Sequence, residues 1–188
     1  YSFRKCMNHF RGIIMGRWIV DQSHSTIGFE VKHMMISNVN GQFDSYTATI
    51  EAEHMEDLTT AEIDFKLDVA SINTYSPDRD NHLKSAEFFH ADAFPKITFM
   101  STTIEKKGDA FLMHGDLTIK ETTRPVTFTV KYGGKGINPW GMEVHGFSAE
   151  TVIIREDFGL TWNAAIEAGG MLVDKKVKIK VDLQVNPA

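Results

Sequence analysis

Hydrophobic and polar residues alternate along most of the chain from residue 17 onward. Apolar side chains occupy every second position in several stretches, and polar side chains fill most of the positions between them. Successive side chains of a β-strand point to opposite faces, so each stretch predicts a strand with one buried and one exposed face. Such alternation is typical of antiparallel sheets, because buried parallel strands are apolar on both faces. The inward-phase positions are Ile27, Phe29, Val31 and His33; Ala61, Ile63, Phe65, Leu67 and Val69; Val126, Phe128, Val130 and Tyr132; and Val177, Ile179, Val181, Leu183 and Val185.

Further strands are predicted from less regular patterns. Residues 46–52 alternate, but Phe43 is out of phase with them, which predicts a β-bulge between the two. Residues 97–104 carry apolar side chains in both phases, and residues 111–117 and 142–154 predict two more strands. Glycine, asparagine and proline predict the turns between strands. These turn signals are Asn40-Gly41, Lys107-Gly108-Asp109, Gly133-Gly134-Lys135-Gly136 and Asn138-Pro139.

One segment predicts a helix instead. Ser76 suits the N-cap, Pro77 the first helical position and Asp78 the first turn, where an acid is favoured. We therefore expect one short helix around residues 77–85 and about eight to ten strands in a single domain. Long alternating strands with few helices form a sandwich or a barrel, and alternation alone does not distinguish them. A closed eight-stranded barrel has an interior wide enough for one small ligand.

Composition and charge narrow the function classes. The chain has 188 residues, of which 42% are hydrophobic, which excludes an intrinsically disordered protein. No apolar run approaches the roughly 20 residues of a membrane-spanning helix, so no integral membrane segment is expected. Residues 1–16 contain three basic residues and no acid, and we expect them to be an N-terminal extension, a tag or a leader remnant. The remaining domain, residues 17–188, has 17 basic and 25 acidic residues, which argues against nucleic acid as a partner.

Several short pieces of sequence between Trp18 and Trp162 together carry a family resemblance. They are Trp18-Ile19-Val20-Asp21, His24-Ser25, Phe29, Val31-Lys32-His33, Gly41-Gln42-Phe43, Arg79-Asp80-Asn81-His82-Leu83, Phe88-Phe89, Pro95-Lys96-Ile97-Thr98-Phe99, Ser101, Gly115-Asp116-Leu117-Thr118-Ile119, Arg155, Asp157-Phe158-Gly159 and Trp162. In this order they resemble the YceI family of lipocalin-like proteins over about residues 17–185. The resemblance implies a single antiparallel lipocalin-like β-barrel with a long hydrophobic cavity that holds a polyisoprenoid or similar long-chain lipid.

The candidate ligand-binding residues follow from the strand faces and from this resemblance. Phenylalanine occurs thirteen times, and its ordinary fate is to fill a core. In a barrel that holds a lipid tail, the same side chains would line the cavity. The residues expected to line it are Phe29, Val31, His33, Ile63, Phe65, Phe99, Phe128, Val130 and Trp162.

The polar cluster at the start of the predicted helix has two interpretations. Arg79 could pair with a ligand phosphate or carboxylate through its planar fork, with Asn81 or His82 bonding the same polar head group. The structural alternative is that the acids favour the helix N-terminus while Arg79 ties the helix to the barrel rim. Both interpretations hold together if the helix covers the mouth of the cavity.

A metal site and a catalytic site are both disfavoured by the sequence. The eight histidines include no pair with the spacing of a known zinc motif, so we expect no metal ion and no other cofactor. Asp21 beside His24-Ser25 suggests a catalytic triad, but neighbours along a chain need not converge in space. No nucleophile elbow or phosphate-binding loop is found, so no catalytic residue is assigned.

The sequence therefore predicts a non-enzymatic protein that binds and sequesters or transports a long-chain apolar ligand, a polyisoprenoid or fatty-acyl lipid. The alternatives are an enzyme acting on such a lipid, and a structural or interaction barrel with a filled core. No secretory signal is seen, so a cytoplasmic location is expected, or a periplasmic or secreted one if a signal preceded residue 1. A homodimer is compatible with the sequence.

Overall fold

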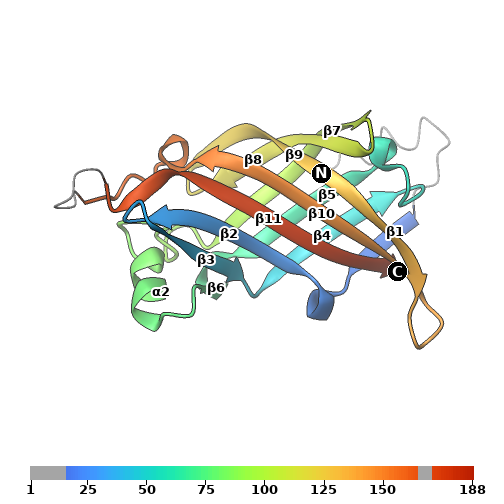
Figure 1. Cartoon of the computed structure of the whole chain (residues 1–188), viewed down its shortest axis with the longest axis horizontal. Helices are drawn as coiled ribbons and strands as arrows, with labels where there is room; N and C mark the ends of the chain where they lie inside the picture. The colour runs from blue at the N-terminus through green and yellow to red at the C-terminus, as the bar shows by residue number, and fades with distance from the viewer. Residues whose placement is uncertain (1–15, 165–170) are drawn as a thin grey trace.

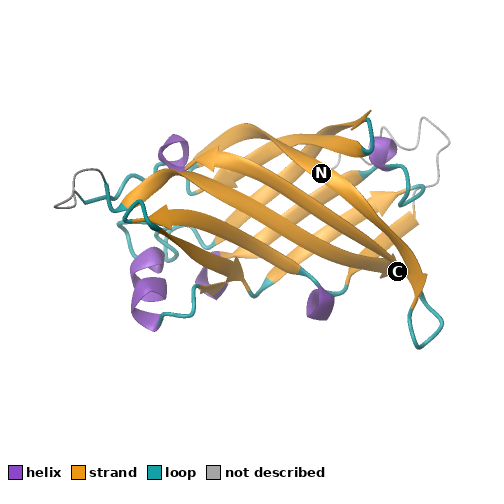
Figure 2. Cartoon of the chain, viewed as in Figure 1, coloured by secondary structure: helices purple, strands orange, loops and turns teal. Residues whose placement is uncertain are grey.

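The computed structural model describes residues 16–164 and 171–188. The predicted extension therefore lies outside the described residues, except for Gly16. Strands make up most of the described chain and wrap into an elongated barrel, with short helical turns in the connections (Figures 1 and 2). None of the helices in the described ranges is long and apolar enough to cross a bilayer. The strands are β1 Gly16–Val20, β2 Thr26–His33, β3 Ser37–Phe43, β4 Tyr46–Ala52, β5 Glu62–Asp68, β6 Ile72–Asn73, β7 Lys96–Lys107, β8 Ala110–Ile119, β9 Thr122–Ile137, β10 Glu143–Ile154 and β11 Val173–Pro187.

The sheet closes on itself. Its strand order is β1-β4-β5-β7-β8-β9-β10-β11-β2-β3-β6, and β1 also pairs with β11. Strands β1 and β2 both pair with β11, while β4 pairs with β1 and β3 with β2, so these segments form two long interrupted strands. Strands β5 and β6 form a third interrupted strand, because β5 pairs with β4 and β6 pairs with β3. The eleven described strands are thus eight antiparallel runs around one barrel, and the predicted fold class is confirmed.

The predicted helix is also confirmed. Helix α2 spans Pro77–Lys84, and the Ser76 side chain accepts a hydrogen bond from the Arg79 amide at its N-terminus. The other helical segments of the described chain are single 3-10 turns: η1 Gln22–His24, η2 Leu58–Thr60, η3 Val69–Ser71 and η4 Arg155–Phe158. Helix α2 and η4 lie at the same end of the barrel, whereas η2 lies at the opposite end (Figure 1).

The mixed phase of residues 97–104 has a local cause. Ser101 pairs with Gly115 and Thr103 pairs with His114, so Thr102 is an extra residue in β7. This bulge shifts the inward phase from odd to even positions, and Ile97, Phe99, Ser101 and Ile104 are all buried. The Ser101 hydroxyl accepts a hydrogen bond from the Ile63 amide at 2.9 Å, which satisfies a donor beside the bulge.

Two of the predicted turns are wrong. Asn40-Gly41 lies inside β3, and Gly133–Gly136 lies inside β9. At Gly41, a Cβ atom would stand 2.3 Å from the Phe29 ring, so glycine makes room for an aromatic side chain on the neighbouring strand. At Gly133 the register shifts by one residue, so this glycine-rich stretch is a β-bulge.

The real β2–β3 turn lies at residues without a turn signal. Met34 and Met35 both have positive φ, of 52° and 64°, and the Ile36 amide donates to the His33 carbonyl. The predicted bulge after Phe43 is a break between β3 and β4 at Asp44 and Ser45. The turns at Gly108-Asp109 and Asn138-Pro139 are confirmed.

Candidate binding cavity

The interior of the barrel contains a cavity of about 210 Å³. All eight runs contribute side chains to its wall, and almost all of these side chains are hydrocarbon or aromatic. An apolar cavity of roughly 150 Å³ is already large enough to stay dry and bind benzene, so this one is suited to an apolar guest. A ten-residue strand such as β8 rises roughly 33 Å along its own axis, which favours an extended guest over a compact one.

The structure brings seven of the predicted residues together in the cavity wall. They come from four strands, β2, β5, β7 and β9, that lie at different positions around the barrel. Phe99 and Phe128 meet edge to face, with ring centroids 5.2 Å apart. These seven residues are Phe29, Val31, Ile63, Phe65, Phe99, Phe128 and Val130.

The other five predicted residues do not line the cavity. His33 pairs with Val173, which does line it, but His33 lies at the very end of β2, before the Met34–Met35 turn. Arg79 and Asn81 are exposed on α2, while His82 and Trp162 are half-buried. Their contact with a ligand stays a prediction, and the structure gives each of the four a place outside the cavity wall.

The hydrogen bonds of Arg79 match the structural alternative. Its Nε donates to Thr74 Oγ1 at 2.8 Å, and its Nη2 donates to the Thr74 carbonyl at 2.7 Å. The Asp80 carboxylate accepts from the amide and hydroxyl of the same threonine at 2.9 and 2.5 Å. Thr74 directly follows β6, so both charged side chains tie the first turn of α2 to the barrel.

Residues after α2 complete the barrel wall where strand pairing is missing. Strand β3 pairs with β6 only through Gln42 and Phe43, so most of this edge of β3 has no strand partner among the described residues. The connection from β6 to β7 lies here and places Leu83, Phe88 and Phe89 in the cavity lining. Helix α2 lies at this end of the barrel (Figure 1), and α2 and the turn after it supply side chains that close this part of the cavity wall. This is the condition under which the two interpretations of the polar cluster hold together.

An aromatic cluster fastens this cover to the β10–β11 connection. The His82 ring packs edge-on against Phe88 and Trp162, with centroid distances of 5.0 and 4.8 Å. Phe88 and Trp162 lie 5.2 Å apart, and Glu87 bonds the His82 Nε2. Two of the predicted ligand residues thus hold the end of the barrel together.

The opposite end is filled by the β4–β5 connection. Met55 and Leu58 are almost completely buried and line the cavity there. Asp57 caps η2 by accepting from the Thr59 amide and hydroxyl at 3.0 and 2.7 Å. These hydrogen bonds hold the pKa of Asp57 below its ordinary value. Met55 and Leu58 lie outside any alternating stretch, so sequence periodicity gave no signal that they line the cavity.

The alternating pattern of β11 also marks residues of the cavity wall, although they were not among the predicted ligand-binding residues. Val177, Ile179, Val181, Leu183 and Val185 share the inward phase of β11, and all five line the cavity. Phe88 and Phe89 belong to the family pattern but fall in no strand. Phe147, Ala149 and Ile153 of β10 also line the cavity, but Val144, Val152 and Ile154 are apolar in the opposite phase and obscure the alternation of this strand.

Arg155 is the one charged residue among the described residues that line the cavity. It belongs to η4 and is only 3% exposed. Its Nε donates to the Asp174 carbonyl at 2.9 Å and its Nη1 to the Leu160 carbonyl at 2.6 Å. Burial lowers the pKa of Arg155 from its ordinary value, against the attraction of Glu156 and Asp174. An arginine keeps its proton in proteins, so this side chain is a buried cation.

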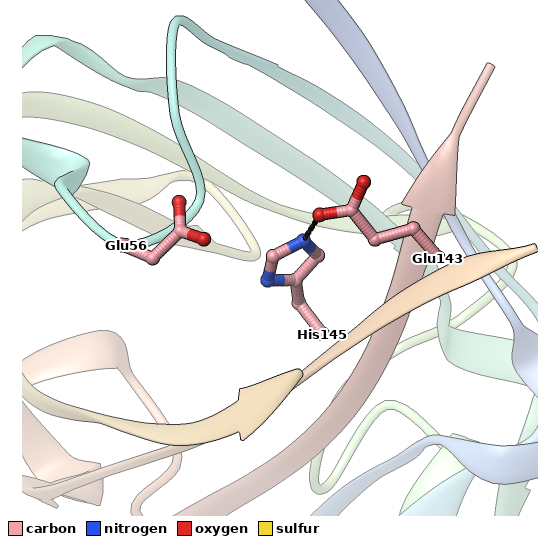
Figure 3. Close-up of side chains that lie close together, drawn as sticks. All are labelled: Glu56, Glu143 and His145. Carbon is pink, nitrogen blue, oxygen red and sulfur yellow. Dashed lines mark hydrogen bonds and ion pairs between the residues drawn. The ribbon is translucent and has the colours of Figure 1, made fainter. Parts of the chain in front are cut away.

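Three possible metal ligands, Glu56, Glu143 and His145, lie close together (Figure 3). Glu56, Glu143 and His145 place one ligand atom each within 4.8 Å of the others. His145 is buried, with its Nε2 2.9 Å from Glu143 and its Nδ1 2.7 Å from the Tyr132 hydroxyl. The Lys135 ammonium lies 4.0 and 3.9 Å from the two carboxylates. Hydrogen bonds and a cation therefore satisfy this cluster already, and we assign it no ion.

The suspected triad does not assemble. Asp21 and His24 are in contact at 2.8 Å, but the Ser25 hydroxyl accepts a hydrogen bond from the Gln184 amide on β11. Asp21 instead caps η1, and hydrogen bonds from Ser23 and His24 lower the pKa of Asp21. The contact between Asp21 and His24 therefore stabilises the turn that joins β1 to β2.

Comparison with known proteins agrees with this architecture. A UPF0312 protein of Staphylococcus aureus (strain MSSA476) is 37% identical over 171 residues, which cover 90% of this chain and 97% of the relative. The Campylobacter jejuni YCEI protein superposes with a TM-score of 0.69 at 30% identity, covering 88% of this chain and 95% of the other.

Two more distant structures share the fold. BcnA of Burkholderia cenocepacia gives a TM-score of 0.76 at 23% identity, over 88% of this chain and 98% of the other. A polyisoprenoid binding domain from Saccharophagus degradans gives 0.61 at 12% identity, over 91% of this chain and 98% of the other. The family model of the YceI-like domain matches residues 18–185. The chain therefore belongs to the YceI family.

Proposed function

We propose that this protein binds a long-chain apolar ligand, a polyisoprenoid or fatty-acyl lipid, inside the barrel and sequesters it from water. The observation that carries the proposal is the apolar cavity enclosed by all eight runs. The similar fold of a domain whose printed description is polyisoprenoid binding supports the choice of ligand class. Storage or transport of the lipid would both follow from such binding.

The chemistry of the wall supports binding rather than catalysis. Among the described lining residues there is no serine, cysteine, histidine, aspartate or glutamate that could act as nucleophile or general acid. An apolar wall offers a guest burial and dispersion contacts, which are non-directional. Such a wall holds a hydrocarbon tail and leaves its bonds unchanged.

The energetics are sufficient for useful affinity. Removing ~500 Å² of hydrocarbon from water contributes about 12 kcal/mol at ~25 cal/mol per Å². Loss of translational, rotational and chain freedom costs about 4–15 kcal/mol, so micromolar or tighter binding is expected only for a well-fitting chain. The fit of the tail inside the cavity therefore decides the affinity.

A substitution that fills the cavity tests the proposal. Ala149 lines the cavity on β10, beside its partners Val130 and Val181. Ala149→Phe places a phenyl ring where the tail would lie, and we expect the affinity for palmitoleic acid and for geranylgeraniol to fall at least tenfold. Titration of delipidated protein, followed by native mass spectrometry, measures both.

Val152→Phe is the matched control. Val152 belongs to the same strand but is 56% exposed, and its partner Lys178 is also on the outer face. The control should bind both lipids like the unmodified protein. Full affinity in a folded Ala149→Phe variant would contradict binding inside the barrel.

The cytoplasmic location and the homodimer stay predictions.

A further inference from the structure

Among the described residues that line it, the cavity is apolar except at one buried cation. Arg155 lines it at the end covered by α2, and this side chain has five N–H groups arranged in a planar fork. Two of its nitrogens donate to backbone carbonyls, which are neutral acceptors. The third nitrogen, Nη2, is buried and has no hydrogen-bond partner among the described residues.

An unpartnered guanidinium nitrogen in an apolar interior is unfavourable by itself. Buried polar groups in native proteins are bonded with few exceptions, and a charged donor is the most costly to leave alone. No carboxylate of the described chain forms an ion pair with Arg155, because Glu156 and Asp174 are exposed and act on it only at longer range. The free donor and its positive charge therefore lack a hydrogen-bond acceptor or an ion-pair partner among the residues that the structure describes.

We propose that Arg155 Nη2 binds the anionic oxygen of the ligand's head group, a carboxylate or a phosphate, while the tail fills the cavity. This inference rests on the proposed function and adds the ligand's head chemistry and its orientation. The head would lie at the α2 and η4 end, and the tail would run toward Met55 and Leu58 at the other end. A guanidinium fork suits both oxyanions, because their oxygens accept its N–H groups with matching geometry.

This assignment differs from the one based on sequence, which gave the head group to Arg79. The two arginines differ in burial and in free donors. Arg79 is exposed, and two of its nitrogens bind Thr74. Arg155 is buried, lines the cavity and keeps a donor free. A charge-assisted hydrogen bond is also stronger where water is excluded, which favours the buried site.

Matched pairs of lipid probes test the inference on the unmodified protein. Geranylgeranyl phosphate is compared with geranylgeraniol, and palmitoleic acid with palmitoleyl alcohol, so the two members of each pair share one tail and differ in a head group that is anionic in one and a neutral hydroxyl in the other. We expect the anionic member to bind about tenfold or more tightly, because a charged acceptor roughly doubles the strength of the bond. The pair with the larger ratio shows whether phosphate or carboxylate is preferred.

Variants then locate the effect. Arg155→Gln should reduce the ratio within each pair toward one while the alcohols keep their affinity. Arg124→Gln is the control, because Arg124 also donates to the backbone of η4, at the Asp157 carbonyl, yet is exposed and outside the cavity wall. Arg155→Lys keeps the positive charge but loses the planar fork, so the preference for the anionic member of each pair should be only partly retained.

A second measurement holds even if the Arg155 variants do not fold. In protein labelled with ¹⁵N-arginine, the anionic probes should shift the side-chain resonances of Arg155, and the alcohols should not. Equal affinities within both pairs, or an unchanged ratio in folded Arg155→Gln, would overturn the inference and leave the proposed function intact. Failure of all four probes to bind would overturn both.

Discussion

At the scale of single residues, the cavity depends on where large side chains have room. The Phe29 ring lies against Gly41 of the neighbouring strand, where any Cβ atom would stand 2.3 Å from the ring. Phe29 also packs against Phe43, with ring centroids 5.9 Å apart. A missing side chain on β3 thus permits an aromatic one on β2, and the pair shapes one side of the cavity wall.

This contact makes a prediction about stability. Gly41→Ala should lower the free energy of unfolding by about 1–3 kcal/mol, because overpacking forces the Phe29 ring or the strand to move. Urea denaturation measures the change. In a Phe29→Ala background the same substitution should cost less, since the ring is absent and only the Thr74 methyl, 2.9 Å from the added Cβ, remains too close.

Gly146→Ala provides the control for the loss of a strand glycine. No atom lies within 4 Å of a Cβ built at Gly146, so we expect a change within about 0.5 kcal/mol there. Equal costs for Gly41→Ala in the presence and absence of the Phe29 ring would show that the contact is not the cause.

At the scale of elements, the β2–β3 hairpin shows a conflict between local propensity and the fold. In the β-turn His33–Ile36 both central residues have positive φ, which asparagine and glycine adopt far more readily than methionine. Here Met34 and Met35 occupy them, with 43% and 61% exposure. Strand β2 is held by β11, β3 pairs with β2 along its length, and the Met34 amide donates to the Leu172 carbonyl at 2.7 Å. The surrounding structure therefore imposes the turn on an unsuited sequence.

Replacing the two methionines should therefore stabilise the protein. Met34→Asn combined with Met35→Gly is expected to raise the free energy of unfolding by about 1 kcal/mol, after the entropy cost of glycine is included. Thermal denaturation should show a rise of roughly 2–4 °C. The neighbouring substitution Ile36→Asn, at an 83% exposed position without positive φ, should have little effect. A loss of stability in the double variant would contradict this account.

At the scale of the whole molecule, closure of the barrel creates the site. Strand β1 pairs with β4 on one side and with the end of β11 on the other, joining residues near the two ends of the described chain. A closed sheet has no long free edge, and its inward side chains enclose a common volume. The two ends are then covered by α2 with its following turn and by the β4–β5 connection. The cavity is a property of all these parts together.

Occupation of the cavity should therefore stabilise the entire fold. A ligand that binds only the folded state adds about 2.7 kcal/mol at a concentration one hundred times its Kd. We expect delipidated protein to melt roughly 5–10 °C higher when palmitoleic acid is added at that excess. At the same lipid concentration the Val152→Phe control should show the same rise, and Ala149→Phe should show at most about half of it, because its affinity is at least tenfold lower. A rise in Ala149→Phe equal to that of the control would place the stabilising lipid outside the barrel.

Sequence alone determined most of the strands, the helix and part of the cavity wall. Period-two alternation reports which face of a strand is buried, so Phe65, Phe99 and Phe128 were identified as interior residues without coordinates. The capping signal at Ser76 and Pro77 is equally local and predicted α2 within one residue of its end. These features depend on neighbours along the chain, and a sequence displays them directly.

Only the tertiary structure decided the rest. The sequence predicted a turn at Gly41, because the contact with Phe29 that requires a glycine there comes from a different strand. It predicted no turn at Met34, because the surrounding structure imposes the positive φ of this residue. Met55 and Leu58 reach the cavity from an irregular connection. The sequence does not show that Nη2 of Arg155 lacks a partner. Whether a donor is free depends on the groups that folding brings around it, here from η4, β11 and the cavity wall.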